Sequence, residues 1–335
     1  SAYTDTNYVF ITEVFMLIKK ERFHFAQEEE GQLMVDVTDR VNNRPIDGAS
    51  VSISYAGDPQ DTLEQLTTDS NGMTEEIDLA APPRSYSEYP LSDVQPYSEY
   101  NLIITAPGYE PTTISGSEIF SGELSIQPVS LNPVLPNASA SVINIPANTL
   151  WGVFPPKIPE DEIKPVRSSG EIVLSRVVIP EYVVVHDGVP SDSSATDYYV
   201  RYADYIKNVA SSEIYSTWPE ATLRANITAI MSFTLNRVYT EWYRNKGYDF
   251  TITTSTAYDH KWVYGRNIFD SISRIVDEIF ANYISRPNVK QPILTQYCDG
   301  KRVSCPNAMS QWGSKALGDD GYSDIEILRY YYGSS

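Results

Sequence analysis

Short runs of alternating apolar and polar residues dominate the first third of the chain. Three clear examples are residues 33–37, 51–55 and 102–104, and they are separated by Asn-Asn, Gly-Asp-Pro and Asn-Gly turn sequences. Alternation with a period of two is typical of strands that bury one face, and such turn residues reverse the chain between strands. Residues 31–133 are therefore predicted to form a small antiparallel β-sandwich.

The spacing of apolar positions changes to a helical period in the second half. Apolar residues recur every three or four positions over residues 223–238 and again from about Asn267 to just before Pro287. The first stretch follows a capping box at residues 217–220, which predicts a helix that ends near Gly247. Ser323-Asp324-Ile325-Glu326 predicts the cap of a short third helix.

Proline usage separates the two halves. Of the 22 prolines, 18 lie before residue 200, which favours strands and loops there and leaves the second half free to form long helices. Residues 134–170 hold six of them and are predicted to be a linker. Residues 171–174 and 182–185 are expected strands of a second, α+β domain at 171–335, which we expect to fold by itself.

The first 30 residues form a separate N-terminal segment. Their apolar clusters end at three consecutive glutamates, residues 28–30. The segment is expected to be a tether or a docking segment for a protein partner, and packing on its own domain is the alternative.

Charge excludes one class of partner. The formal net charge is −19; residues 1–200 carry 10 basic and 30 acidic side chains, and residues 201–335 carry 15 and 14. A nucleic-acid-binding surface needs a basic patch, so nucleic acid is not expected as a partner. The sequence has no run of about 18 apolar residues, so no membrane span is expected.

Three segments of the second half carry candidate chemistry. Residues 211–225 place Glu213 ahead of the predicted helix. Residues 258–265 read Tyr-Asp-His-Lys-Trp-Val-Tyr-Gly, and residues 308–316 contain Met-Ser-Gln-Trp-Gly.

In this order the three segments resemble the SpoIID family of sporulation proteins, which is related to the amidase enhancers. The family pattern is a Glu, then Trp-Pro-x-Glu-Ala-Leu-Lys-Ala, a Tyr-x-Gly, Met-Ser-Gln-Trp-Gly-Ala and a closing Gly-Tyr-Ser-x-x-x-Ile-Leu-x-x-Tyr-Tyr. The likeness covers about residues 171–333. It implies an α+β fold and lytic transglycosylase activity on peptidoglycan glycan strands, or a role in assisting amidases.

The resemblance implies that Glu213 is the catalytic acid/base. One carboxylate suffices for this reaction, because the sugar's own 6-hydroxyl is the nucleophile. Burial against Tyr215 or Trp218 would raise the pKa of this carboxyl, whereas a helix N-terminus would lower it. The substrate-binding residues expected around it are Tyr215, Arg224, His260, Tyr264, Gln311 and Trp312.

Two departures from the family pattern keep a second function open. Met231 stands where the family has an arginine, and Pro306-Asn307-Ala308 replaces Gly-His-Gly. Arg224 or Arg237 is a candidate replacement for the arginine, and His260 for the histidine. The alternative function is a non-catalytic wall-binding or assembly module, as in a surface machine or a phage-like tail.

The front half resembles a second family. Arg-Pro-Ile-Asp-Gly-Ala-Ser-Val at 44–51, Thr-Asp-Ser-Asn-Gly at 68–72 and Ala-Pro-Gly-Tyr at 106–109 are similar to the carboxypeptidase-regulatory-like (transthyretin-like) sandwich. Modules of that family are mostly scaffolds or spacers, so this resemblance implies no chemistry.

The two cysteines, Cys298 and Cys305, are expected to form a disulfide in an extracellular chain. The alternative implied by the SpoIID resemblance is a zinc site of His260, Cys298 and Cys305. No other cofactor is expected. Together the two resemblances place the chain outside the cell, at the wall of a bacterium.

Overall fold

The computed structural model describes residues 29–90, 92–136, 139–165 and 173–333. Most of the predicted N-terminal segment therefore lies outside the described residues. Its last two residues, Glu29 and Glu30, begin the first strand of the fold.

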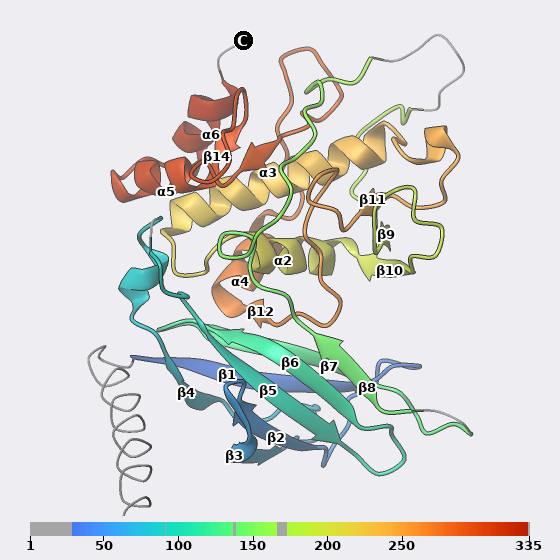
Figure 1. Ribbon diagram of the computed structural model, residues 1–335. Coiled ribbons are helices and arrows are strands. Elements are labelled where there is room, and N and C mark those ends of the chain that lie inside the picture. Colours follow the sequence, from blue (N-terminus) through green and yellow to red (C-terminus); the bar gives the residue numbers. More distant parts are fainter. Residues whose placement is uncertain (1–28, 91, 137–138, 166–172, 334–335) are drawn as a thin grey trace, which may run out of the picture.

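The N-terminal unit is a sandwich of two sheets (Figure 1). One sheet has the order β12-β7-β1-β4 and the other the order β3-β2-β5-β6-β8. The strands of this unit are β1 (Glu29–Asp39), β2 (Ser50–Tyr55), β3 (Asp58–Thr67), β4 (Ile77–Ala81), β5 (Ser98–Thr105), β6 (Thr112–Ile119), β7 (Leu124–Leu131) and β8 (Ser141–Asn144). The strand β12 (Ile268–Phe269), which joins the first sheet, comes from the second unit.

The alternating pattern produces this sandwich as predicted. Leu33, Val35 and Val37 of β1 are fully buried, and they share one core with Val51 and Leu102 of the facing sheet. The sandwich is not purely antiparallel, however. β1 pairs with β7 and β6 pairs with β8 in parallel. Turn sequences identify strands that a short loop joins, and such strands pair antiparallel. Parallel pairs join strands that are distant in sequence, so turn sequences do not reveal them.

The second unit is mixed α and β. Its strands are β9 (Tyr182–His186), β10 (Asp197–Arg201), β11 (Ile252–Thr253), β13 (Tyr297–Cys298) and β14 (Met309–Ser310). Its α-helices are α2 (Tyr202–Glu213), α3 (Glu220–Tyr239), α4 (Asp270–Ile279), α5 (Gln311–Asp319) and α6 (Asp324–Tyr332). α3 crosses the middle of this unit (Figure 1) and is buried on nearly every side. None of the described helices combines the length and the apolar character that a membrane span requires.

The predicted helices exist, with different ends. α3 stops at Tyr239, and Gly247 instead closes the short 3₁₀ helix η2 (Arg244–Lys246) with a φ of 85°. The second predicted helix is shorter than expected from about Asn267, because Ile268–Phe269 form β12, α4 begins at Asp270, and α4 ends at Ile279. The cap predicted at Ser323 is confirmed, with the Ser323 and Glu326 side chains each bonded to the other's backbone.

The capping box predicted at 217–220 is wrong. The N-cap of α3 is Pro219, which makes no side-chain bond. The hydroxyl of Thr217 lies 2.7 Å from that of Ser87, next to the 3₁₀ helix η1 (Arg84–Ser87) of the sandwich. A contact between the two units thus replaces the local cap.

The segment predicted as a linker does not separate the two units. Its residues 141–144 are β8 of the sandwich, and its later part packs on the second unit. Glu160 pairs with Arg237 at 2.6 Å and Glu162 with Arg286 at 2.5 Å. Of the strand predicted at 171–174, the described residues 173–174 are not in a strand.

The two units share both a sheet and a core. β12 of the second unit pairs with β7 of the sandwich. Phe120 of the sandwich packs against Tyr215 and Phe269, with ring centroids 5.3 Å away in each case. Independent folding of residues 171–335 would therefore require β12 to leave its sheet and these rings to lose their contacts.

Candidate functional site

Glu213 is buried at the end of a helix. It is the last residue of α2, and the next residue, Ile214, is extended with φ −132° and ψ 161°. Glu213 does precede α3, which begins at Glu220, but it is itself the last residue of α2, the end at which a helix dipole is negative. Its side chain accepts two hydrogen bonds, from the Lys261 N–H at 2.6 Å and from the Tyr297 hydroxyl.

A pocket of about 250 Å³ lies over this carboxylate. Glu213, Tyr297 and Gln311 line it from the second unit. Thr149 and residues 153–157 also line it, with Phe154 and Lys157 among them, and we call residues 149–157 the strap. Glu213 itself is only 2% exposed.

Arg302 fastens the first half of the strap. Its guanidinium donates hydrogen bonds to the carbonyls of Thr149, Trp151 and Gly152 at 2.8, 3.1 and 2.7 Å. The same guanidinium is held by the Asp299 carboxylate at 3.0 Å. Arg302 is thus the guanidinium that lines the pocket, although no motif points to it.

Lys157 fastens the other end of the strap. Its ammonium donates to the carbonyl of Asp259 and lies 4.7 Å from the centre of the Tyr297 ring. Burial lowers the pKa of Lys157, while the charges of Glu213 and Asp259 oppose that shift. Burial raises the pKa of Tyr297 well above its usual value, and the Glu213 charge adds to this. The Tyr297 phenol therefore keeps its proton and donates a hydrogen bond to Glu213.

His260 lies behind the pocket rather than in it. The side chain is fully buried, its ring stacks on Tyr297, and its Nδ1 lies 3.0 Å from the Tyr205 hydroxyl. Burial lowers the pKa of His260 well below its usual value, and the charges of Lys157 and Arg237 lower it further. Nε2 has no hydrogen-bond partner among the described residues. His260 is not placed to contact a substrate, contrary to the expectation from the sequence.

Only one of the predicted substrate-binding residues joins Glu213 at the pocket. Gln311, the first residue of α5, lines the pocket and donates from Nε2 to the Glu213 carbonyl at 3.0 Å. Tyr215 and Trp312 are 2% and 6% exposed and belong to an aromatic cluster with Trp218. These rings are core, because their faces are covered by one another and by Phe120.

The candidate replacements for the family arginine lie elsewhere. Arg224 pairs with Glu220 at 2.7 Å and with Glu278 on the outer face of α3. Met231 is fully buried in the core. Arg237 is 1% exposed and pairs with Asp259 at 2.7 Å, which makes it part of the interior network.

Tyr264 lines a different hollow, which lies at the junction with the sandwich, together with Arg40. The structure therefore separates Tyr264 from the Glu213 pocket.

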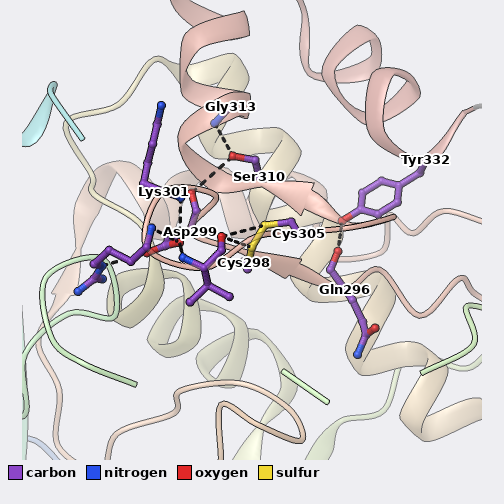
Figure 2. The surroundings of a disulfide bond; sticks show 10 residues. Gln296, Cys298, Asp299, Lys301, Cys305, Ser310, Gly313 and Tyr332 are labelled. Carbon is purple, nitrogen blue, oxygen red and sulfur yellow. Dashed lines mark hydrogen bonds and ion pairs between the residues drawn. A yellow bond between two sulfur atoms is a disulfide. The ribbon is translucent and has the colours of Figure 1, made fainter. Parts of the chain in front are cut away.

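The cysteines are joined as a disulfide in the loop that carries Arg302 (Figure 2). Their Cα atoms are 5.7 Å apart, within the usual range for this bond. The Asp299 carboxylate organises the loop by accepting from the N–H groups of Lys301 and Val303 at 3.0 and 2.9 Å. Zinc does not fit these residues, because the two sulfurs are bonded to each other. The described residues contain no group of three or more His, Cys, Asp or Glu that could hold a metal ion.

Comparison with known proteins finds no matching family model and no matching curated protein. Solved structures with partial likeness include the Bacillus anthracis TIE protein, at 16% identity and TM-score 0.22 over 32% of this chain and 17% of that chain. Klebsiella pneumoniae 5-hydroxyisourate hydrolase matches at 18% identity and TM-score 0.21 over 31% of this chain and 92% of its own. A minor pilin of Streptococcus agalactiae matches at 17% identity and TM-score 0.23 over 34% and 49%. The chain thus spans less than two thirds of the first and third of these proteins, and likenesses of this size define no function.

Proposed function

We propose that this chain is a SpoIID-like protein of the bacterial cell wall that cleaves peptidoglycan glycan strands as a lytic transglycosylase. The position of Glu213 carries the proposal. Its carboxylate lies at a pocket of about 250 Å³ that Gln311 also lines. Residues from the first and third candidate segments of the sequence therefore meet at one pocket, as a shared catalytic role requires.

In the proposed reaction Glu213 donates a proton to the glycosidic oxygen, and the bond between that oxygen and the anomeric carbon breaks. The 6-hydroxyl of the same sugar attacks the anomeric carbon, closes an anhydro ring and returns its proton to Glu213. No water is consumed, so a second carboxylate to activate water is not needed. The Lys261 N–H donates to Oε1 of Glu213 and the Tyr297 hydroxyl to Oε2, and these two hydrogen bonds would hold the carboxylate in position.

The strap has to move before a glycan strand can reach this carboxylate. Phe154 and Lys157 line the pocket together with Glu213, and Glu213 itself is only 2% exposed. The arrangement described here is therefore the closed form of the proposed enzyme, and release of the contacts made by Arg302 would open it.

A specific observation favours a second candidate, a wall-binding or assembly module without catalysis. Met231 is core, and Arg224 and Arg237 are engaged in ion pairs away from the pocket. Neither candidate arginine therefore supplies the charge that the family pattern places near the glutamate. The closed pocket is also compatible with a Glu213 that only stabilises the fold.

The test compares the wild type with Glu213→Gln on intact peptidoglycan and on peptide-stripped glycan strands, with release of anhydro-ended products as the readout. Glutamine keeps the shape of the side chain and cannot transfer the proton, so turnover should fall by on the order of 10²–10⁴. Glu220→Gln is the matched control, because the Glu220 side chain is 68% exposed at the start of α3. Equal release by wild type and Glu213→Gln would remove Glu213 from the mechanism. No release by the wild type on either substrate would favour the binding module.

A further inference from the structure

A groove of about 520 Å³ lies where the sandwich meets the second unit, and it shares no lining residue with the Glu213 pocket. We call it the interface groove. The residues that matter for its chemistry are Arg40, Thr112, Asn144, Tyr198, Trp262 and Tyr264. The first three come from the sandwich side and the last three from the second unit, so the groove exists only when the two units are joined.

Aromatic rings form one wall of the interface groove. Tyr198 and Tyr264 are stacked, with ring centroids 5.0 Å apart and planes inclined by 23°, and Trp262 lies 5.2 Å from Tyr198. Both tyrosines are half-buried, so part of each ring faces the groove. Alternation along β10 turns the next residue, Tyr199, outward, where it is 77% exposed. The Arg40 guanidinium also covers Tyr264, at 5.3 Å from its ring centre, so the half-buried Tyr198 ring is the apolar surface that we consider for the C–H face of a sugar ring.

Two buried polar atoms in the same groove lack partners. The Thr112 hydroxyl and the Trp262 Nε1–H have no hydrogen-bond partner among the described residues, although the two side chains are 1% and 5% exposed. A buried polar group without a partner is costly, so such groups usually meet a ligand, a water molecule or another residue. A ligand rich in carbonyl and hydroxyl groups would satisfy both of them.

The groove also adjoins the Glu213 pocket. Lys261 lines the groove, and its backbone N–H donates to Glu213 at 2.6 Å. The Lys261 ammonium lies 5.4 Å from the ring of Phe154 in the strap. A polymer held in the groove would therefore continue toward Glu213 once the strap moves away.

From these three observations we propose that the interface groove is a binding subsite for a chain of N-acetylated sugars. Tyr198 stacks on a sugar ring and is backed by Tyr264, and the Trp262 N–H and Thr112 hydroxyl bond to acetamido and hydroxyl groups. The inference rests on the proposed function and extends it, because it assigns the sandwich a part in holding the glycan strand.

Binding of the hexamer of N-acetylglucosamine to the full chain, measured by calorimetry, tests the proposal. We expect Tyr198→Ala to weaken binding by about ten-fold or more, because one stacking surface is lost. Trp262→Phe keeps an aromatic ring but removes the N–H donor together with part of the indole, so it should also weaken binding. Tyr199→Ala removes a neighbouring tyrosine from the outer face of the same strand and should bind as the wild type does. Each variant is accepted only if its melting curve matches that of the wild type.

The outcomes separate this inference from the proposed function. No binding by the wild type, or equal affinity of Tyr198→Ala and wild type, overturns the subsite. Binding that depends on Tyr198 in a protein that never releases anhydro-ended products would support the subsite and refute the enzyme. Release that is the same in Tyr198→Ala and wild type would leave the enzyme standing and overturn the subsite.

Discussion

The buried ion pair between Arg266 and Glu118 gives the sharpest test of how the two units hold together. Nη1 of Arg266 lies 2.9 Å from Oε2 of Glu118, and Nη2 lies 2.9 Å from Oε1. Both side chains are about 1% exposed. The same guanidinium donates to the carbonyls of Pro146 and Ser211 at 3.1 and 3.4 Å. The pair therefore crosses the interface with almost no access to water.

Removing one partner of a buried ion pair costs about 3–5 kcal/mol, because the other charge is left uncompensated in a site of low polarity. We expect Arg266→Met and Glu118→Leu each to lower the free energy of unfolding by about this amount. The double variant removes both charges and leaves only the two carbonyls without the guanidinium, a loss of about 1–3 kcal/mol for each carbonyl. It should therefore cost clearly less than the two single variants together.

The measurement is chemical denaturation of the full chain, followed by circular dichroism and tryptophan fluorescence. Arg224→Met is the matched control, because the carboxylates that Arg224 meets, Glu220 and Glu278, are 68% and 57% exposed. An exposed pair of this kind contributes less than about 1 kcal/mol. An Arg266→Met variant as stable as Arg224→Met would refute the reasoning. So would single costs that simply add in the double variant.

Two further predictions concern the surroundings of the Glu213 pocket. Because the pKa of His260 is depressed in the folded state, the unfolded chain binds the extra proton below pH ~6.5, so stability should fall as the pH drops from 7 to 5 and His260→Gln should flatten that slope in denaturation curves. A slope unchanged by the substitution would count against a neutral, buried His260. Arg302→Ala should speed hydrogen exchange across the strap, residues 149–157, because three of its carbonyls lose their donor, whereas Lys301→Ala in the same loop should leave exchange unchanged. Equal exchange in the two variants would mean that Arg302 does not hold the strap.

The sequence predicts those parts of the fold that depend on residues close together in the chain. Alternation over β1 and β2 predicted the sandwich, because each strand buries one face and the burial period equals the sequence period. Ser323 and Glu326 predicted the start of α6, because both bonds of a capping box join residues three positions apart.

The errors arose where distant contacts replaced local ones. α2 carries no capping side chain at its first turn, so no start signal marks it. Thr217 looked like the cap of α3, but its hydroxyl meets Ser87 of the sandwich. The proline-rich segment resembled a spacer, yet Glu160 enters a nearly buried pair with Arg237. These contacts join residues that are far apart in the sequence, so the pattern within one segment could not predict them.

Some residues of the candidate site could be predicted from local motifs, and others could not. Glu213 and Gln311 each belong to a recognisable motif, and the structure brings them to one pocket. Tyr215 and Trp312 are predicted from the sequence to bind substrate, but an aromatic side chain suits a core equally well, and burial decides between the two. Lys157 and Arg302 were missed, because their importance follows only from the folding of the strap over Glu213.

The closed pocket does not argue against binding of a polymer, because the strap is held weakly compared with what a ligand can supply. The three hydrogen bonds from Arg302 to the strap have a charged donor and are each worth about 1.5–3 kcal/mol when buried, but the Arg302 side chain is 44% exposed and solvent reduces that contribution. Opening therefore costs a few kcal/mol for this end of the strap. A ligand of micromolar affinity releases about 8 kcal/mol. A glycan strand would displace the strap only to the extent that it binds the open form more tightly than the closed form, and contact with Glu213 would be available to it only in the open form.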